Sequence, residues 1–282
     1  MNTGCHTSHV TRDPRWAQTL LIAGTVATLG LLLFLPLLLV FSEAFKKGTA
    51  LYFQALTEAN ARSAITLTLS VAAMAVPLNA IFGLAAAWAI AKFEFRAKSF
   101  LLALLDLPFA VSPVVAGMVY LLLFGGGSFL GNYLDQRGVQ IVFALPGMVL
   151  ATLFVTFPFV ARELIPLMQA QGTDQETAAL SLGASGWRTF LRITLPNTRW
   201  ALFYGLILSN ARAMGEFGAV SVISGHIRGE TNTLPLHVEV LYNEYQSAAA
   251  FACASLLSLL GLATLALKSF IEWRVGRRRN LP

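Results

Sequence analysis

Two charged residues lie inside an apolar run in the second half of the chain. Arg212 and Glu216 are four residues apart within the run 200–224, and Ser209 precedes them on the same helical face. Charges inside a bilayer cost at least about 2.5–3.5 kcal/mol each, so they should face a protein interior or a water-filled path. Two interpretations stay open: the pair neutralises itself and locks its helix in place, or it lines the path or gate of an anion.

A second stretch, Leu164–Arg199, separates two apolar runs and mixes small, apolar and polar residues. Asp174 and Glu176 are placed where a helix N-terminus favours acidic side chains, and Gly183 permits a turn. The pattern predicts two short helices, ended before Pro196, with an apolar surface and basic flanks. Such a surface either docks into the groove of a partner protein or lies on the bilayer.

Residues able to perform catalysis or hold a metal are sparse. Cys5, His6 and His9 lie close together, but no second cluster completes a set of metal ligands. Cys253 lies in an apolar run, so a disulfide with Cys5 is not expected. The sequence has no G-x-x-x-x-G-K-[ST] loop for ATP and no G-x-S-x-G or H-E-x-x-H motif. We therefore expect no catalytic residue, metal, cofactor or ATPase site in this chain.

Composition places the chain among membrane proteins. Of its 282 residues 56% are hydrophobic and 12% charged, about half the charged fraction of a soluble domain, roughly 25%. Apolar runs approach or exceed the ~20 residues that cross ~30 Å of hydrocarbon. They predict an all-α integral membrane protein with six transmembrane helices, at 17–41, 65–91, 100–124, 139–160, 200–224 and 248–271.

Glycine and proline predict features inside these spans. Pro77 should kink the second span, and Gly215 and Gly218 could break the fifth beside Glu216. Small residues four apart suit close packing of helices, as in the pairs Gly83 with Ala87 and Gly205 with Ser209.

The basic residues predict the orientation. Fourteen of the 20 Lys and Arg residues fall on one side of this layout and five on the other, with Arg212 within a span. By the positive-inside rule, both termini and the stretch 164–199 are cytoplasmic. The net charge of +6 therefore reflects topology, and binding of nucleic acid is not expected.

Residues 178–196 also form a motif. They resemble the E-A-A-x3-G-x9-I-x-L-P loop of ABC-importer permeases, matched here by Ala178, Ala179, Gly183, Ile193, Leu195 and Pro196. In that family the loop docks as a coupling helix into a cleft of the ATPase subunit, so the resemblance implies an ATPase-coupling role for these residues. The motif glutamate falls on Thr177, and Glu176 lies one place early. Whether Glu176 replaces it stays open, and both residues join the coupling set.

Three segments resemble CysW-type permeases of bacterial sulfate/thiosulfate importers: LLDLPFAVSPVVAGMVYLL, LGASGWRTFLRITLPNTRWALFYG and NARAMGEFGAVSVISGHIRGETNTLPL. The resemblance implies the MetI-like fold of type I importers and a place in the inner membrane. It also implies four partners: a CysT-like permease subunit, two CysA-like ATPase subunits that use ATP-Mg, and a periplasmic sulfate/thiosulfate-binding protein. Whether the permease is a heterodimer or a homodimer stays open.

The expected layout follows from the spans and the resemblance. It comprises a cytoplasmic N-terminal tail at 1–16, a first transmembrane helix at 17–41, a permease domain at 60–271 that contains the coupling loop 164–199, and a basic tail at 272–282.

Energetics favour ATP-driven import by alternating access. A dianion entering a negative cell opposes the potential by about 2 × 2.3 kcal/mol per 100 mV, so uptake needs an energy source. One alternative is the same machine with molybdate or tungstate as substrate. Another is a proton-coupled secondary anion transporter that uses Arg212 and Glu216, although no inverted repeat is recognisable. Asp106 would repel an anion, so we expect it to pack helices.

Overall fold

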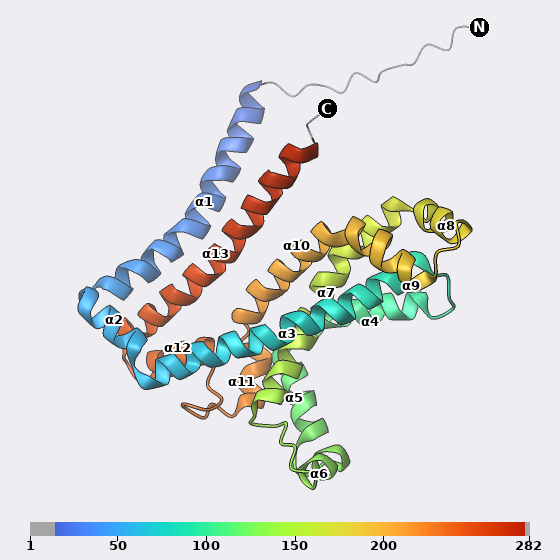
Figure 1. Ribbon diagram of the computed structural model, residues 1–282. Helices are drawn as coiled ribbons and strands as arrows, with labels where there is room; N and C mark the ends of the chain where they lie inside the picture. Colours follow the sequence, from blue (N-terminus) through green and yellow to red (C-terminus); the bar gives the residue numbers. More distant parts are fainter. Residues whose placement is uncertain (1–14, 280–282) are drawn as a thin grey trace.

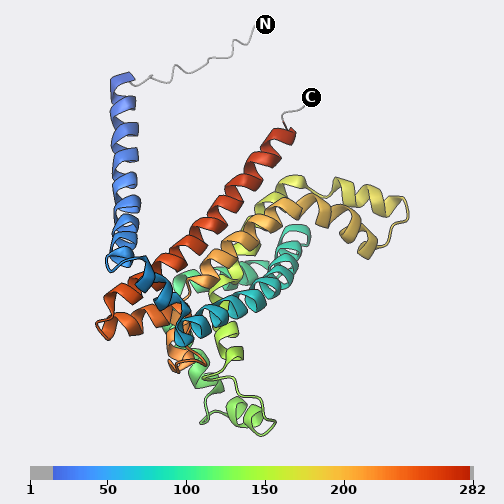
Figure 2. The same ribbon diagram turned by 60° about the vertical axis from the view of Figure 1, so that its left-hand side comes forward.

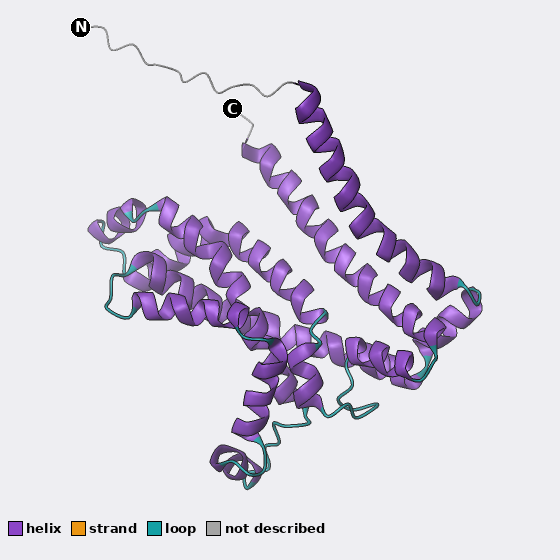
Figure 3. Cartoon of the chain, turned by 180° about the vertical axis from the view of Figure 1, so that it is seen from behind, coloured by secondary structure: helices purple, strands orange, loops and turns teal. Residues whose placement is uncertain are grey.

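The computed structural model describes residues 15–279, which form helices joined by loops (Figure 1, Figure 3). The all-α class is confirmed for this part. Cys5, His6 and His9 lie outside the described residues, as do most of the expected N-terminal tail and residues 280–282. The elements are α1 (Arg15–Phe45), α2 (Thr49–Thr57), α3 (Ala59–Lys92), α4 (Lys98–Ala110), α5 (Pro113–Phe124), α6 (Phe129–Asp135), α7 (Leu145–Gln171), α8 (Asp174–Ser181), α9 (Gly186–Thr189), the π-helix η1 (Phe190–Thr194), α10 (Leu195–Met214), α11 (Gly218–Ser224), α12 (Leu234–Asn243) and α13 (Ser247–Arg279).

The structure does not confirm the prediction of six spans. Within residues 15–279, four helices are long and apolar enough to cross a membrane: α1, α3, α7 and α13. Helices α4 and α5 qualify as a fifth span only as a pair bent by 108°. The expected span at 200–224 is divided into α10 and α11, and the polar residues of α10 keep it out of this set.

Each of the two interruptions has a local cause. Pro113 disfavours helical geometry at the preceding residue, and Val111 and Ser112 accordingly have ψ angles of 132° and 134°. α10 ends at Met214 and α11 begins at Gly218, which confirms the break expected there. Pro77, in contrast, lies inside α3, which continues from Ala59 to Lys92.

Helices α3, α7 and α10 form the centre of the bundle, and glycines let them approach. A Cβ on Gly205 of α10 would lie 2.8 Å from the Cα of Val160, and one on Gly83 of α3 would lie 2.7 Å from the Val160 Cβ. Both distances are below normal contact, so a larger residue would push α7 away. This confirms the predicted role of the small residues at 83 and 205 in close helix packing.

α1 lies at the outside of the molecule. It contacts α13 near α2 and diverges from it toward the chain ends (Figure 1, Figure 2). Its apolar side chains are exposed along most of the helix, with Leu21 at 70% and Phe34 at 65%, and only its end near α2 is buried, at Ala44. An exposed apolar surface of this size needs lipid or another membrane subunit to cover it.

The stretch expected as a loop at 164–199 is largely helical. α7 continues through Gln171 and α10 begins at Leu195, so only 172–194 lies between the long helices. The two short helices predicted there are present as α8 and α9, at the tips of α7 and α10 (Figure 1). The π-helix η1, which the sequence did not predict, joins α9 directly to α10.

Candidate functional site

Arg212 and Glu216 form an ion pair at the end of α10. Nη1 of Arg212 lies 2.6 Å from Oε2 of Glu216, a close charge contact whose angle is not that of a hydrogen bond. The Glu216 side chain is 1% exposed, whereas that of Arg212 is 35% exposed. A buried carboxylate needs a neighbouring charge and hydrogen bonds. Arg212 supplies that charge and still reaches open space.

Glu216 also stabilises the helix break. Its Oε1 accepts a hydrogen bond of 2.9 Å from the backbone N–H of Ala219, which belongs to the first turn of α11. The first N–H groups of a helix lack partners within it, and an acidic group there satisfies one of them. One carboxylate therefore pairs with Arg212 and holds the start of α11.

Arg212 lines an open hollow of about 450 Å³. The other walls come from the α4–α5 bend, Pro108 to Pro113, and from Val155 and Phe159 of α7. Arg212 is the charged residue of this lining, since the rest are apolar residues and Ser112. A guanidinium against low-dielectric walls attracts anions more strongly than one in open water.

Ser209 occupies a different environment from Arg212. It is fully buried, and its hydroxyl accepts a hydrogen bond of 2.9 Å from Nδ2 of Asn79. The same Nδ2 donates to the hydroxyl of Thr156 at 2.6 Å. This polar contact joins α10, α3 and α7 and lies outside the lining of the hollow. Sequence reasoning missed Asn79, and its position as the one amide within the expected span 65–91 was the available signal.

A cluster of exposed apolar side chains covers α8, α9 and η1. We call it the α8–α9 apolar surface. Such side chains are normally buried, and their grouping on two short helices leaves an apolar surface that a partner protein or the bilayer would have to cover. Their exposed fractions are 52% for Leu180, 89% for Leu182, 66% for Trp187 and 43% for Leu191.

Gly183 closes α8 with a Schellman motif. Its φ is +85°, a conformation that side chains with a Cβ rarely adopt. Its N–H donates to the carbonyl of Leu180 and the N–H of Ala184 donates to that of Ala179, both at 3.0 Å. A Cβ here would meet open space, with nothing within 4 Å. The backbone turn therefore explains the glycine, and the space above it stays free.

Glu176 points inward, toward α3. Its Oε1 lies 2.8 Å from Nζ of Lys92 and accepts a hydrogen bond of 3.1 Å from the Thr194 hydroxyl. Burial alone would raise the pKa of the Glu176 carboxyl, but the hydrogen bond and charge of Lys92, helped by Thr194, hold that pKa below its usual value. Lys92 was not among the predicted site residues.

The remaining predicted coupling residues lie in α8, in η1 and in the first turn of α10. Thr177, at the position of the motif acid, is exposed, and its hydroxyl donates to the carbonyl of Thr173 in its own helix. Pro196 is exposed in the first turn of α10. Ala178 is exposed, and three others are half-buried: Ala179, Ile193 and Leu195.

Asp106 binds Arg162 rather than any group in the hollow. Its Oδ1 accepts a hydrogen bond of 2.6 Å from Nη2 of Arg162, whose guanidinium lies 4.2 Å from the ring centroid of Phe109. These contacts join α4 to α7, as expected for a residue that packs helices.

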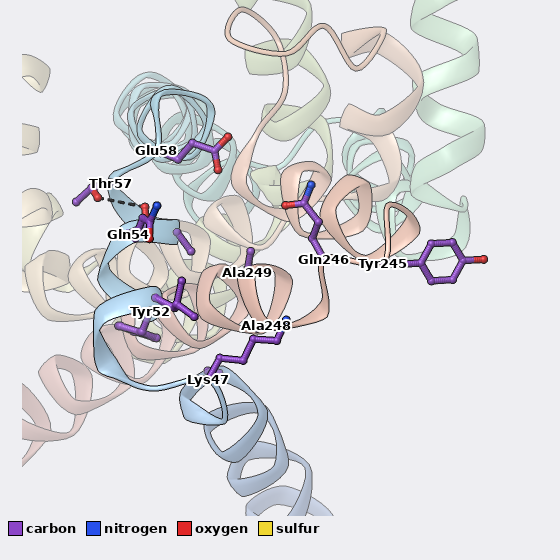
Figure 4. A pocket seen from close by; sticks show the side chains of 12 residues that line it. Lys47, Tyr52, Gln54, Thr57, Glu58, Tyr245, Gln246, Ala248 and Ala249 are labelled. Atoms are coloured by element: carbon purple, nitrogen blue, oxygen red, sulfur yellow. Dashed lines mark hydrogen bonds between the residues drawn. The ribbon is translucent and has the colours of Figure 1, made fainter.

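A larger groove of about 550 Å³ lies elsewhere, between α2 and the corner of α12 and α13 (Figure 4). Lys47, Glu58 and Gln246 are among its polar lining residues, and Tyr245 projects away from it. No predicted site residue lines this groove.

Among residues 15–279 no three His, Cys, Asp or Glu side chains lie close enough to hold a metal.

The long apolar helices are typical of an integral membrane protein, and comparison with known proteins gives its class. Residues 79–277 match the family described as "Binding-protein-dependent transport system inner membrane component". The chain belongs to this family, the permease subunits of ABC transporters, and the resemblance seen in the sequence is confirmed at that level.

The particular relatives are sulfate permeases. The chain is 50% identical to "Sulfate transport system permease protein CysW" of Escherichia coli K12, over 95% of this chain and 92% of that protein. It is 34% identical to "Sulfate transport system permease protein CysT" of the same strain, over 92% and 94%. The fold is shared with a chain in a crystal structure of a bacterial alginate ABC transporter in complex with an alginate pentasaccharide-bound periplasmic protein. The TM-score is 0.74 with 15% identity, over 92% of this chain and 95% of that one.

Proposed function

We propose that this chain is the membrane-spanning permease subunit of an ATP-driven importer that moves sulfate or thiosulfate across the bacterial inner membrane. The observation that carries the proposal is the 50% identity with a CysW sulfate permease over 95% of this chain. Two features of the structure support it: an α8–α9 apolar surface suited to docking and an arginine that lines a hollow at two helix breaks.

The stretch 172–194 is the ATPase-coupling element in this proposal. Its exposed surface comprises Leu180, Leu182, Trp187 and Leu191, and the free space above Gly183 allows an ATPase to approach the backbone. η1 continues without a break into α10. Movement of the docked surface therefore passes along the backbone into the helix that carries Arg212.

Arg212 and Glu216 act on the translocation path. Arg212 attracts the anion to the hollow, and the adjacent Glu216 prevents tight binding that would slow release. Alternating access follows if the angle at the α10–α11 and α4–α5 breaks changes when the coupling element moves. Ser209, whose position on the same helical face makes it a candidate for the path, joins α10 to α3 in this proposal.

The partners follow from the same proposal. They are a CysT-like permease subunit in a heterodimer, two CysA-like ATPase subunits that hydrolyse ATP-Mg, and a periplasmic sulfate/thiosulfate-binding protein that selects the substrate. Both termini are cytoplasmic, as the basic residues indicate. In support, the start of α1 and the end of α13 lie on the same upper side of Figure 1 as α8, and α2 and α6 lie on the lower side.

Co-purification and transport test this function together. The tagged chain, expressed with its neighbours, should retain an ATPase and a second permease, and proteoliposomes with the binding protein should take up sulfate only when ATP is supplied. Uptake without the ATPase subunits that collapses with a proton uncoupler would instead support a secondary transporter that uses Arg212 and Glu216. Stronger inhibition by molybdate or tungstate than by thiosulfate would favour the molybdate alternative.

A further inference from the structure

Lys92, the last residue of α3, is a buried cation outside the predicted site. Its side chain is 6% exposed, and its Nζ lies 2.8 Å from Oε1 of Glu176 in α8. Nζ also donates a hydrogen bond to the carbonyl of Gly172, the residue that ends α7. One ammonium group therefore joins the ends of α3 and α7 to α8.

A row of aromatic rings makes a second connection at the same place. Trp187, on the α8–α9 apolar surface, stacks on Phe190 of η1 with centroids 5.6 Å apart. Phe190, only 9% exposed, contacts Trp88 of α3 with centroids 4.7 Å apart. Trp88 and Lys92 are four residues apart and therefore lie on one face of α3. An aromatic and an ionic contact thus join the docking surface to the last turn of α3.

α3 leads from this junction to the centre of the bundle. Its Asn79 donates to Ser209 of α10 and to Thr156 of α7 at 2.9 and 2.6 Å. Ser209 is three residues before Arg212 in the same helix. α3 is far from the coupling element in sequence, and these side-chain contacts connect its last turn directly to α8 and η1.

We propose that Lys92 and Trp88 make the end of α3 a second entry point for movement of the coupling element, beside the backbone route into α10. In this view Glu176 is a positioning residue that pairs with Lys92 inside the protein and does not contact the ATPase. The physical reason is that separating the pair would leave the Lys92 ammonium, on a side chain only 6% exposed, without its counter-ion, so α8 and the end of α3 move as one body. This inference rests on the proposed function.

The test is a double-mutant cycle in the whole transporter, reconstituted with its ATPase and binding protein. Lys92→Met and Glu176→Gln are made singly and together, and three quantities are measured: ATPase retained on purification, ATP hydrolysis, and sulfate taken up per ATP. Lys92→Arg keeps the charge. Lys98→Met is the matched control, because Lys98 pairs at 2.7 Å with Glu94, whose side chain is 89% exposed.

We expect both single variants to keep the ATPase bound and hydrolysing, while uptake per ATP falls by about fivefold or more, the usual size of a coupling between sites. The double variant should be no worse than either single one, because both remove the same contact. Lys92→Arg should stay close to the wild type, Lys98→Met should be unaffected, and Trp88→Leu should lower uptake per ATP independently.

Three outcomes would overturn the inference. Unchanged uptake per ATP in Lys92→Met would show that movement does not pass through the end of α3. Loss of bound ATPase in Glu176→Gln but not in Lys92→Met means that Glu176 faces the ATPase. Loss of the ATPase in both means that the ion pair only builds the docking surface. Failure of the proposed function is separate, since the wild-type vesicles would then show no ATP-driven uptake of sulfate.

Discussion

Arg212 combines a buried counter-ion with partial access to the hollow at the α4–α5 bend. The guanidinium is 35% exposed while the carboxylate that it pairs with is 1% exposed. A pair that only locked helices together would be expected to bury both groups. The difference in exposure supports the proposed role of Arg212 on the path, while the buried Glu216 both tempers its charge and accepts the hydrogen bond of Ala219.

Replacing Arg212 by Ala tests this assignment. We expect uptake to fall about tenfold or more, which corresponds to losing roughly 1.4 kcal/mol of favourable interaction with the anion. The complex should still assemble. Arg199→Ala is the control, because Arg199 lies on the same helix at its exposed end. Radiolabelled sulfate uptake and size-exclusion chromatography measure the two effects, and failure of Arg212→Ala to assemble would assign the arginine to packing.

The ion pair of Glu176 has a predictable dependence on pH. Because its pKa in the folded chain lies below its usual value, the pair stabilises the fold above the unfolded pKa, and this contribution is lost as pH falls through the folded pKa. The difference in thermal stability between wild type and Glu176→Gln should therefore stay constant around neutral pH and shrink in acid. Glu94→Gln serves as control, and a difference that grew in acid would contradict the ion pair.

At the scale of elements, breaks and close approaches decide the arrangement. The helix break before Gly218 was predictable from the two glycines at 215 and 218. The close packing at Gly83 and Gly205 was predictable because each has another small residue four positions later. The 108° bend between α4 and α5 was not predicted, although Pro113 signals it, because hydropathy continues through the bend. The inward turn of Glu176 was also hidden, since Lys92 lies 84 residues away in sequence.

The α8–α9 apolar surface yields a prediction at Gly183. Gly183→Asp should leave the protein inserted in the membrane but remove ATPase binding, because it strains a turn with φ +85° and adds a charge to an apolar surface. Gly229→Asp is a matched control, since Gly229 has φ +81° and equally open surroundings away from this surface. Equal ATPase retention in both variants would contradict the docking assignment.

The contact of α10 with α7 yields a second prediction. Gly205→Ala places a Cβ 2.8 Å from the Val160 backbone, and overpacking of this kind costs about 1–3 kcal/mol. We expect a lower melting temperature for the purified chain. Gly261→Ala, with nothing within 4 Å of the new Cβ, should have little effect. Equal melting temperatures would show that α10 and α7 can separate without cost.

The whole molecule has surfaces that one chain cannot cover. α1 exposes its apolar side chains along most of its length, and the α8–α9 apolar surface is also uncovered. The membrane class and family were predictable from composition and from the motif at 178–196. The predicted count of six spans is not confirmed, because the polar residues of α10 lower its hydropathy and the helix breaks before Gly218.

The central claim is that this chain passes an anion only when an ATPase moves its α8–α9 apolar surface. The most direct measurement is sulfate uptake by proteoliposomes that contain this chain with its partner subunits and binding protein, with ATP or a non-hydrolysable analogue inside. The account predicts uptake with ATP, none with the analogue, and none with Gly183→Asp under either condition. Equal uptake with ATP and with the analogue would contradict it.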